Sequence, residues 1–305
     1  MTEKQKKIRG TIFALTGGAL WGFSGTCGQY IFANSTMSSE TVTSLRMLGS
    51  GLILLLFCLI TRKGKTFAIW KEPKDAIRLL CFSLLGLLFC QYAYLSAIKH
   101  SNSGTATVLQ YTGIVLLMIV TCLLEKRMPA KREGAAVLLA MGGVFLLATH
   151  GQPGDLVISS QGLFWGMIAA ISLVTYNILP GDILKKWGTP VVNGFGMLIG
   201  GVVLAVVFRL WEENWNYDVY IFGALAAIIL IGTLLAFCLY LQGVADLGPM
   251  KASLFGCAEP VMAAIISALW LHTTFTVVDL MGFVLIIGAV LLVSSREKES
   301  DGEQD

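Results

Sequence analysis

Apolar segments about twenty residues long follow one another along nearly the whole chain, and the connections between them are short. A helix rises about 1.5 Å per residue, so about 20 apolar residues span the ~30 Å hydrocarbon layer of a bilayer. Only 13% of the residues are charged, whereas soluble domains carry about 25%. The sequence therefore predicts an all-α integral membrane protein with ten transmembrane helices: Gly10–Phe32, Thr41–Ile60, Ile77–Ile98, Ser103–Leu124, Gly134–Thr149, Gln161–Leu179, Val191–Trp211, Val219–Gly243, Lys251–Leu271 and Val277–Ser295.

The lysines and arginines predict how these helices are oriented. If the N-terminus is cytoplasmic, nearly all of the 22 basic residues fall in segments on the cytoplasmic side. Only Lys99 and Arg209 fall on the outer side, and Arg46 lies within a span. Because cytoplasmic loops are enriched in Lys and Arg, we expect a multi-pass protein of the cytoplasmic membrane with both termini in the cytoplasm. The basic residues do not cluster on one element, so we expect no nucleic-acid partner.

The second half of the sequence resembles the first. A shift of 146 positions places residues 87–148 on residues 233–294 without a gap, and pairs Tyr94-Leu95 with Tyr240-Leu241. Predicted spans three to five then correspond to spans eight to ten. We expect two repeats, residues 1–150 and residues 151–305, the second of which ends in a short charged tail. Five spans is an odd number, so the two repeats should be inverted relative to each other around a central cavity, as in many transporters.

One carboxylate interrupts the ninth predicted span. Glu259 lies about 12 Å from Lys251 along the helix, near the middle of the bilayer, where a charge costs roughly 2.5–3.5 kcal/mol. Pro260 follows it directly and cannot donate to the helix ladder, so we expect a kink or a free carbonyl beside the acid. An acid at a helix break in mid-membrane indicates a proton or substrate site. The alternative is a structural acid paired with a buried donor, for which Arg46 in span two is the candidate.

Polar and aromatic side chains on other spans are candidates for lining the same cavity. Some of them would instead form ordinary hydrogen bonds between helices. Tyr94 and Tyr240 occupy matching repeat positions, which suggests opposite gates; rings at the membrane interface are the alternative. Besides Glu259, Pro260 and Arg46, the candidate substrate-binding or coupling residues are Trp21, Gln91, Tyr94, Gln110, Tyr111, Tyr176, Asn177 and Tyr240.

Motifs for other chemistries are weak or absent in the sequence. The seven cysteines show no CxxC or Cys/His spacing, which argues against a metal site. Gly22-Phe23-Ser24-Gly25 matches the short G-x-S-G pattern of intramembrane serine proteases, but no histidine falls near it. The other glycines of this span are expected to serve close helix packing. No phosphate-binding loop or H-E-x-x-H motif occurs. We therefore expect no catalytic residue, no metal and no cofactor.

Several short motifs, in this order and spacing, resemble the EamA-like branch of the drug/metabolite transporter superfamily. They are Ala19–Gly22, Arg46, Leu124–Arg127, Gly134–Val144, Lys251–Ser253, Ala258–Val261 and Gly282–Val290. Two places depart from the family pattern. Leu271-His272-Thr273 stands where the second repeat usually carries an acid, and Gly113-Ile114 stands where the first repeat often has a proline. The second departure predicts that span four is straighter than span nine.

This resemblance implies a bundle with alternating access that moves small metabolites such as amino acids. Together with Glu259 and the absence of an ATPase motif, it predicts a secondary transporter, an exporter rather than an importer, of a small polar metabolite. Protons are a candidate coupling partner, lipid surrounds the protein, and a homodimer is one possible assembly. The alternatives are a channel, a flippase of lipid-linked or polyprenol-linked substrates, and an intramembrane serine protease.

Overall fold

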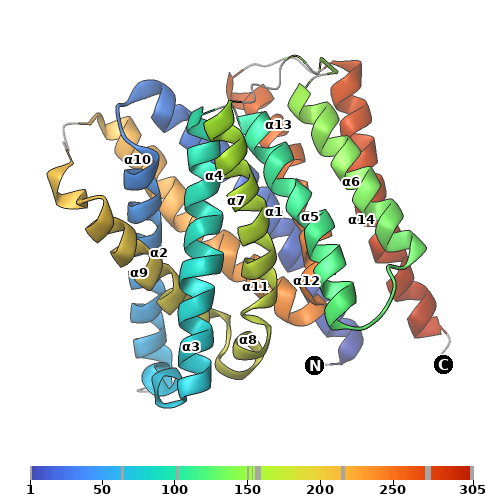
Figure 1. Ribbon diagram of the computed structural model, residues 1–305, viewed down its shortest axis with the longest axis horizontal. Coiled ribbons are helices and arrows are strands. Elements are labelled where there is room, and N and C mark those ends of the chain that lie inside the picture. The colour runs from blue at the N-terminus through green and yellow to red at the C-terminus, as the bar shows by residue number, and fades with distance from the viewer. Residues whose placement is uncertain are drawn as a thin grey trace.

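The computed structural model describes residues 2–62, 65–100, 103–149, 151–152, 154, 159–213, 217–271 and 276–302, and in these residues the regular structure is helical. The helices in chain order are α1 (Glu3–Asn34), α2 (Ser39–Arg62), η1 (Lys65–Lys71), α3 (Pro73–Cys81), η2 (Phe82–Leu88), α4 (Phe89–His100), α5 (Ser103–Leu124), α6 (Lys131–Thr149), α7 (Ser160–Ile178), α8 (Gly181–Trp187), α9 (Thr189–Val207), η4 (Leu210–Glu212), α10 (Val219–Ala227), η5 (Ile228–Leu235), α11 (Ala236–Leu247), α12 (Pro249–Gly256), α13 (Ala258–Leu271) and α14 (Val277–Gly302). They form one bundle (Figure 1).

Six helical segments of the described residues are long and apolar enough to cross a membrane, and Val277–Ala289 is a shorter apolar helix. The fold is thus that of an all-α membrane protein, while the predicted number of ten spans is not confirmed by length and composition. The ninth predicted span shows one reason: it is divided into α12 and α13, of 8 and 14 residues. Each piece alone is too short to cross a bilayer.

The division between α12 and α13 follows from Pro260. A proline ring clashes with the carbonyl four residues earlier, which here belongs to Gly256, the last residue of α12. Cys257 separates the two helices, and Pro260 lies in the first turn of α13, where proline is tolerated. At the matching place in the first half, α5 runs unbroken through Gly113 and Ile114. The expected difference between spans four and nine is therefore present. The departure at His272 and Thr273 lies outside the described residues.

Matching helices of the two halves begin at positions related by the same shift as the sequence repeat. This shift relates the starts of α3 and α10, of the π-helical segments η2 and η5, of α5 and α12, and of α6 and α14, which are Pro73 and Val219, Phe82 and Ile228, Ser103 and Pro249, and Lys131 and Val277. The repeat found in the sequence thus extends to the positions where helices start and change their winding.

The packing of the helices shows the same relation between the halves. α1 packs on α11 and α13, while α7 packs on α4 and α5; α2 packs on α9, and α6 packs on α14 (Figure 1). If each helix in these contacts is replaced by its counterpart in the other half, the same set of contacts results. The N-terminus and the end of α14 lie at the same end of the bundle (Figure 1). α1 runs away from this end, whereas α7, its counterpart, runs toward it. The two halves are therefore inverted, as predicted.

Two glycines set the distance between α2 and α9. A Cβ atom added to Gly51 would lie 2.5 Å from the backbone nitrogen of Leu198, and one added to Gly201 would lie 2.7 Å from that of Leu48. In each of these two contacts, a glycine of one helix lies against the backbone of a leucine of the other helix. They bring the two backbones together, which is the usual function of small residues between membrane helices.

Candidate functional site

A cavity lies between the two halves. Space for the centres of water-sized molecules totals about 80 Å³, and one water needs roughly 10–15 Å³ on this measure. The cavity thus has room for several waters or one small organic solute. It is lined by Trp21, Ser24, Gly25, Gly28, Val42, Arg46, Cys90, Gln91, Tyr94, Leu95, Gln110, Tyr111, Ile114, Leu173, Tyr176, Asn177, Ile228, Phe237, Tyr240, Ser253, Gly256 and Glu259.

The carboxylate of Glu259 is held in this cavity by tyrosines of the first half. Tyr111 Oη donates to Glu259 Oε2 at 3.1 Å, and Tyr94 Oη donates to Oε1 at 3.4 Å. Tyr111 Oη also lies 3.1 Å from the carbonyl oxygen of Gly256, the carbonyl that Pro260 frees from the helix ladder. Glu259 itself is 9% exposed. The helix break therefore leaves the Gly256 carbonyl as a free acceptor beside the acid of Glu259.

The guanidinium of Arg46 enters the same cavity from α2. It is 7% exposed; its Nε donates to Thr233 Oγ1 at 3.1 Å, and its Cζ lies 5.8 Å from the centre of the Phe237 ring. Within the described part of the chain, no ion pair joins Arg46 to Glu259. A structural pair between these two residues, the alternative left open by the sequence, is thus not what the structure contains. The guanidinium of Arg46 and the carboxyl group of Glu259 thus lie at separate places in the cavity.

Several polar atoms in the wall of the cavity have no hydrogen-bond partner. Gln91 is 3% exposed, and both its Oε1 and its Nε2 are unpaired. Trp21 Nε1 and Tyr176 Oη are also buried and unpaired. A buried polar atom without a partner costs about 1–3 kcal/mol. Such atoms at a cavity wall mark a place where a solute or water can supply the missing partner.

Aromatic rings close the cavity on the side nearer the termini. Tyr176 stacks on Tyr240 at 5.9 Å and on Phe82 at 5.9 Å, and Trp21 lies 4.5 Å from Tyr240 between ring centres. Tyr240 Oη donates to Asn177 Oδ1 at 2.7 Å. Asn177 also lines a second pocket beyond these rings, with Lys6, Glu125, Lys185 and Asp246. The rings and the Tyr240–Asn177 hydrogen bond thus separate the two hollows.

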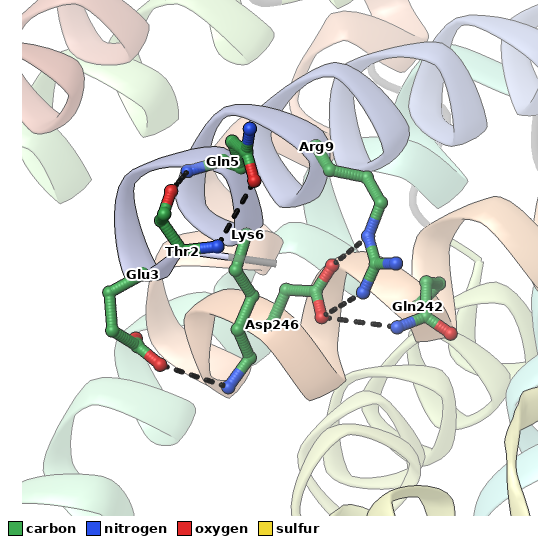
Figure 2. Close-up of polar contacts among 7 residues, drawn as sticks. All are labelled: Thr2, Glu3, Gln5, Lys6, Arg9, Gln242 and Asp246. Atoms are coloured by element: carbon green, nitrogen blue, oxygen red, sulfur yellow. Dashed lines mark hydrogen bonds and ion pairs between the residues drawn. The ribbon is translucent and has the colours of Figure 1, made fainter.

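An ion pair ties α1 to α11 at the end of the bundle near the termini (Figure 2). Arg9 Nε and Nη2 donate to the two carboxylate oxygens of Asp246 at 2.9 and 2.8 Å, and Gln242 Nε2 donates to Asp246 Oδ1 at 3.1 Å. Thr189 on α9 in turn donates to Gln242 Oε1 at 3.0 Å. The hydrogen bonds to Asp246 raise the pKa of Arg9, so this guanidinium keeps its charge. The network links three helices across the two halves.

All candidate residues except Pro260 line the cavity. Pro260 acts on the backbone instead, through the break beside Glu259. Tyr94 and Tyr240 both line the cavity. Sequence reasoning missed several lining residues, which are Ser24, Gly25, Gly28, Cys90, Phe237 and Ser253. Comparing the two repeats position by position would have indicated Phe237, which matches Gln91.

Ser24 of the G-x-S-G pattern lies in the cavity wall and packs against Gly232 on η5. The structure describes His100 alone of the three histidines; it ends α4, and no hydrogen bond joins it to Ser24. Among the described residues, no group of His, Cys, Asp and Glu is arranged to hold a metal ion. The polar groups that line the cavity include Glu259, Arg46, Gln91 and the tyrosine hydroxyls.

Two inverted halves around a cavity lined by polar residues are the architecture of many membrane transporters. The model of the EamA-like transporter family matches residues 8–149 and 160–295, and the chain belongs to this family. It is 38% identical over 286 residues to the uncharacterized inner membrane transporter YicL of Salmonella typhimurium, over 94% of this chain and 95% of the relative. It is 25% identical to the protein PecM of Dickeya dadantii, over 85% of this chain and 86% of that one.

A solved crystal structure has the same fold. It aligns with a TM-score of 0.78 over 95% of this chain and 98% of that chain, at 17% sequence identity. The protein is thus a multi-pass membrane transporter of the drug/metabolite transporter superfamily.

Proposed function

We propose that this transporter is a secondary exporter that moves a small polar metabolite, such as an amino acid, by alternating access. The observation that supports this most directly is the placement of Arg46 and Glu259 in one cavity without an ion pair between them. A zwitterion presents a carboxylate and an ammonium, which are the groups that a separate cation and anion bind.

Coupling is proposed to run through Glu259. Its two hydrogen-bond donors, Tyr94 and Tyr111, both belong to the first half, while Glu259 belongs to the second. A movement of one half against the other changes these bonds, so the protonation or pairing of the acid can follow the side to which the cavity opens. Protons are the proposed partner, and the termini are proposed to be cytoplasmic.

The first experiment is a thermal-shift screen of the purified protein against amino acids, nucleosides, sugars and cationic drugs. A ligand at 100 times its Kd stabilises the folded state by about 2.7 kcal/mol. Compounds that raise the melting temperature are then tested in proteoliposomes for counterflow, in which unlabelled solute inside drives uptake of labelled solute. Stabilisation by amino acids together with counterflow supports the proposal. Ion-channel currents without counterflow would contradict alternating access.

Orientation is tested separately, in cells. A reporter that is active only in the cytoplasm is fused after Asp305. Activity supports cytoplasmic termini, whereas activity only of a reporter that works outside the cytoplasm contradicts them.

A further inference from the structure

The two halves place matched positions in the cavity wall, but with different side chains. Under the shift that relates the repeats, Gln91 corresponds to Phe237 and Tyr94 to Tyr240, and all four line the cavity. The inverted repeat therefore allows each wall position to be compared with its counterpart on the other side.

The register of the first helices follows from their packing. A Cβ atom on Gly22 of α1 would collide with the carbonyl oxygen of Glu259, and one on Gly113 would lie 2.5 Å from that of Ala170 on α7. Glu259 and Gly113 are counterparts, so Gly22 and Ala170 are counterparts too. In the register that this pair sets, Gly25 corresponds to Leu173 and Gly28 to Tyr176, and these four also line the cavity.

On the side nearer the termini, these positions are filled. The ring of Tyr176 lies 5.8 Å from that of Phe237 and stacks on Tyr240 at 5.9 Å. Leu173 lines the same wall. The side chains of the second half thus pack against one another and leave no room for a solute between Tyr176 and Phe237.

On the opposite side, the counterpart positions are empty. Cβ atoms built on Gly25 and Gly28 meet no atom within 4 Å. Gln91, which takes the place of Phe237, is 3% exposed, and both atoms of its amide are unpaired. The space that Tyr176 fills in one half is therefore open in the other, beside a buried group that lacks hydrogen-bond partners.

We propose that this space is the subsite for the side group of the transported solute, and that Gly25 and Gly28 set the size of that group. The subsite takes a small solute with an apolar or aromatic group no larger than a tyrosine side chain, next to an atom that hydrogen-bonds to Gln91. This inference rests on the proposed transport function, and it adds a size limit and the residues that impose it.

The test uses the purified full-length protein and three probes of increasing size: L-alanine, L-leucine and L-phenylalanine. Gly28→Phe is compared with Gly223→Phe, because a Cβ on Gly223 also meets no atom within 4 Å but this exposed residue lies outside the cavity. We expect Gly28→Phe to weaken binding of leucine and phenylalanine at least tenfold and of alanine less than twofold. Gly223→Phe should bind like the parent. Unchanged phenylalanine binding by a folded Gly28→Phe overturns the proposal.

A second experiment needs no solute. Gly28→Cys and Gly223→Cys in proteoliposomes are exposed to a positively charged methanethiosulfonate, with the parent as the measure of reaction at native cysteines. We expect Gly28→Cys to react beyond the parent. Gly223→Cys should not, because Gly223 lies in the predicted span Val219–Gly243, where its exposed surface would face lipid that the charged reagent does not enter. If Gly28→Cys stays unmodified, the subsite is refuted. If the parent binds none of the three probes yet Gly28→Cys reacts, the proposal that the solute is an amino acid fails. The proposal of an open space beside Gly28 is still supported.

Discussion

The hydroxyl of Tyr111 on α5 donates to the carboxylate of Glu259 on α13 at 3.1 Å, and so joins matching spans of the two inverted halves. The same hydroxyl reaches the Gly256 carbonyl at 3.1 Å. A single side chain of the first half thus contacts both the acid and the free carbonyl that lie beside the helix break in the second half. Any rearrangement that separates the halves must break or replace these contacts.

Replacing the acid tests its role in coupling. Glu259→Gln keeps the shape of the side chain and an oxygen acceptor for Tyr111, but it removes the charge and the titratable proton. We expect transport in proteoliposomes to fall at least tenfold and to lose its dependence on pH. Glu212→Gln, at an exposed residue, is the control and should behave like the parent. Parental rates and pH dependence in Glu259→Gln would remove Glu259 from the mechanism.

Removing one hydroxyl tests how firmly the acid is held. Tyr111→Phe deletes the bonds to Glu259 and Gly256 and changes little else. Hydrogen bonds between membrane helices contribute about 0.6 kcal/mol on average and up to about 1.7, so we expect a loss of roughly 1 kcal/mol in unfolding experiments. Transport should fall as well. Tyr220→Phe, at a 69% exposed tyrosine, should change neither stability nor transport. An equal effect of the two changes would argue against a specific role for Tyr111.

The contact between α2 and α9 predicts opposite effects for two alanine substitutions. Gly51→Ala places a methyl group against the backbone of Leu198, which forces the helices apart and should cost about 1–3 kcal/mol. Gly223→Ala adds the same methyl group in open space, where alanine favours the helix by roughly 0.5–1 kcal/mol. Denaturation in detergent measures both. Stabilisation by Gly51→Ala would mean that the helices are farther apart than the structure shows.

The ion pair near the termini predicts a difference between two aspartates. Asp246 has a side chain that is 2% exposed and accepts two bonds from Arg9, which is 38% exposed. We expect Asp246→Asn to cost about 1–2 kcal/mol. Asp182→Asn breaks the pair with Arg78, in which both side chains are exposed, and should cost less than about 1 kcal/mol. Unfolding by denaturant compares them. Equal losses would indicate that Arg9 and Asp246 do not stay paired in solution.

Much of the architecture could be predicted because it follows from backbone chemistry and hydropathy. The shift between the sequence repeats reappears in the helix starts, and Pro260 breaks its helix where its ring meets the Gly256 carbonyl. The number of spans could not be settled in this way. Hydropathy treats residues 251–271 as one segment, whereas the structure divides them at Cys257.

The details of the cavity depend on relations that a single helix pattern does not contain. Gly22 packs against the Glu259 backbone, while Gly25 and Gly28, one and two turns further on, border open space. All three look alike in the sequence, and only the partner helix distinguishes them. Likewise, two opposite charges within the predicted spans suggested a pair, but tyrosines bind Glu259 and a threonine binds Arg46.

The π-helical turns of η2 and η5 are a departure from α-helical winding that both halves share. Such turns are rare within α-helices and are frequently found at functional sites. Both halves carry such a segment, starting at Phe82 and Ile228, at the same distance from the start of the helix that contains it. A π-helical segment at the same place in both halves, with different side chains in Phe82–Leu88 and Ile228–Leu235, is thus a property of the repeated fold rather than of one local sequence.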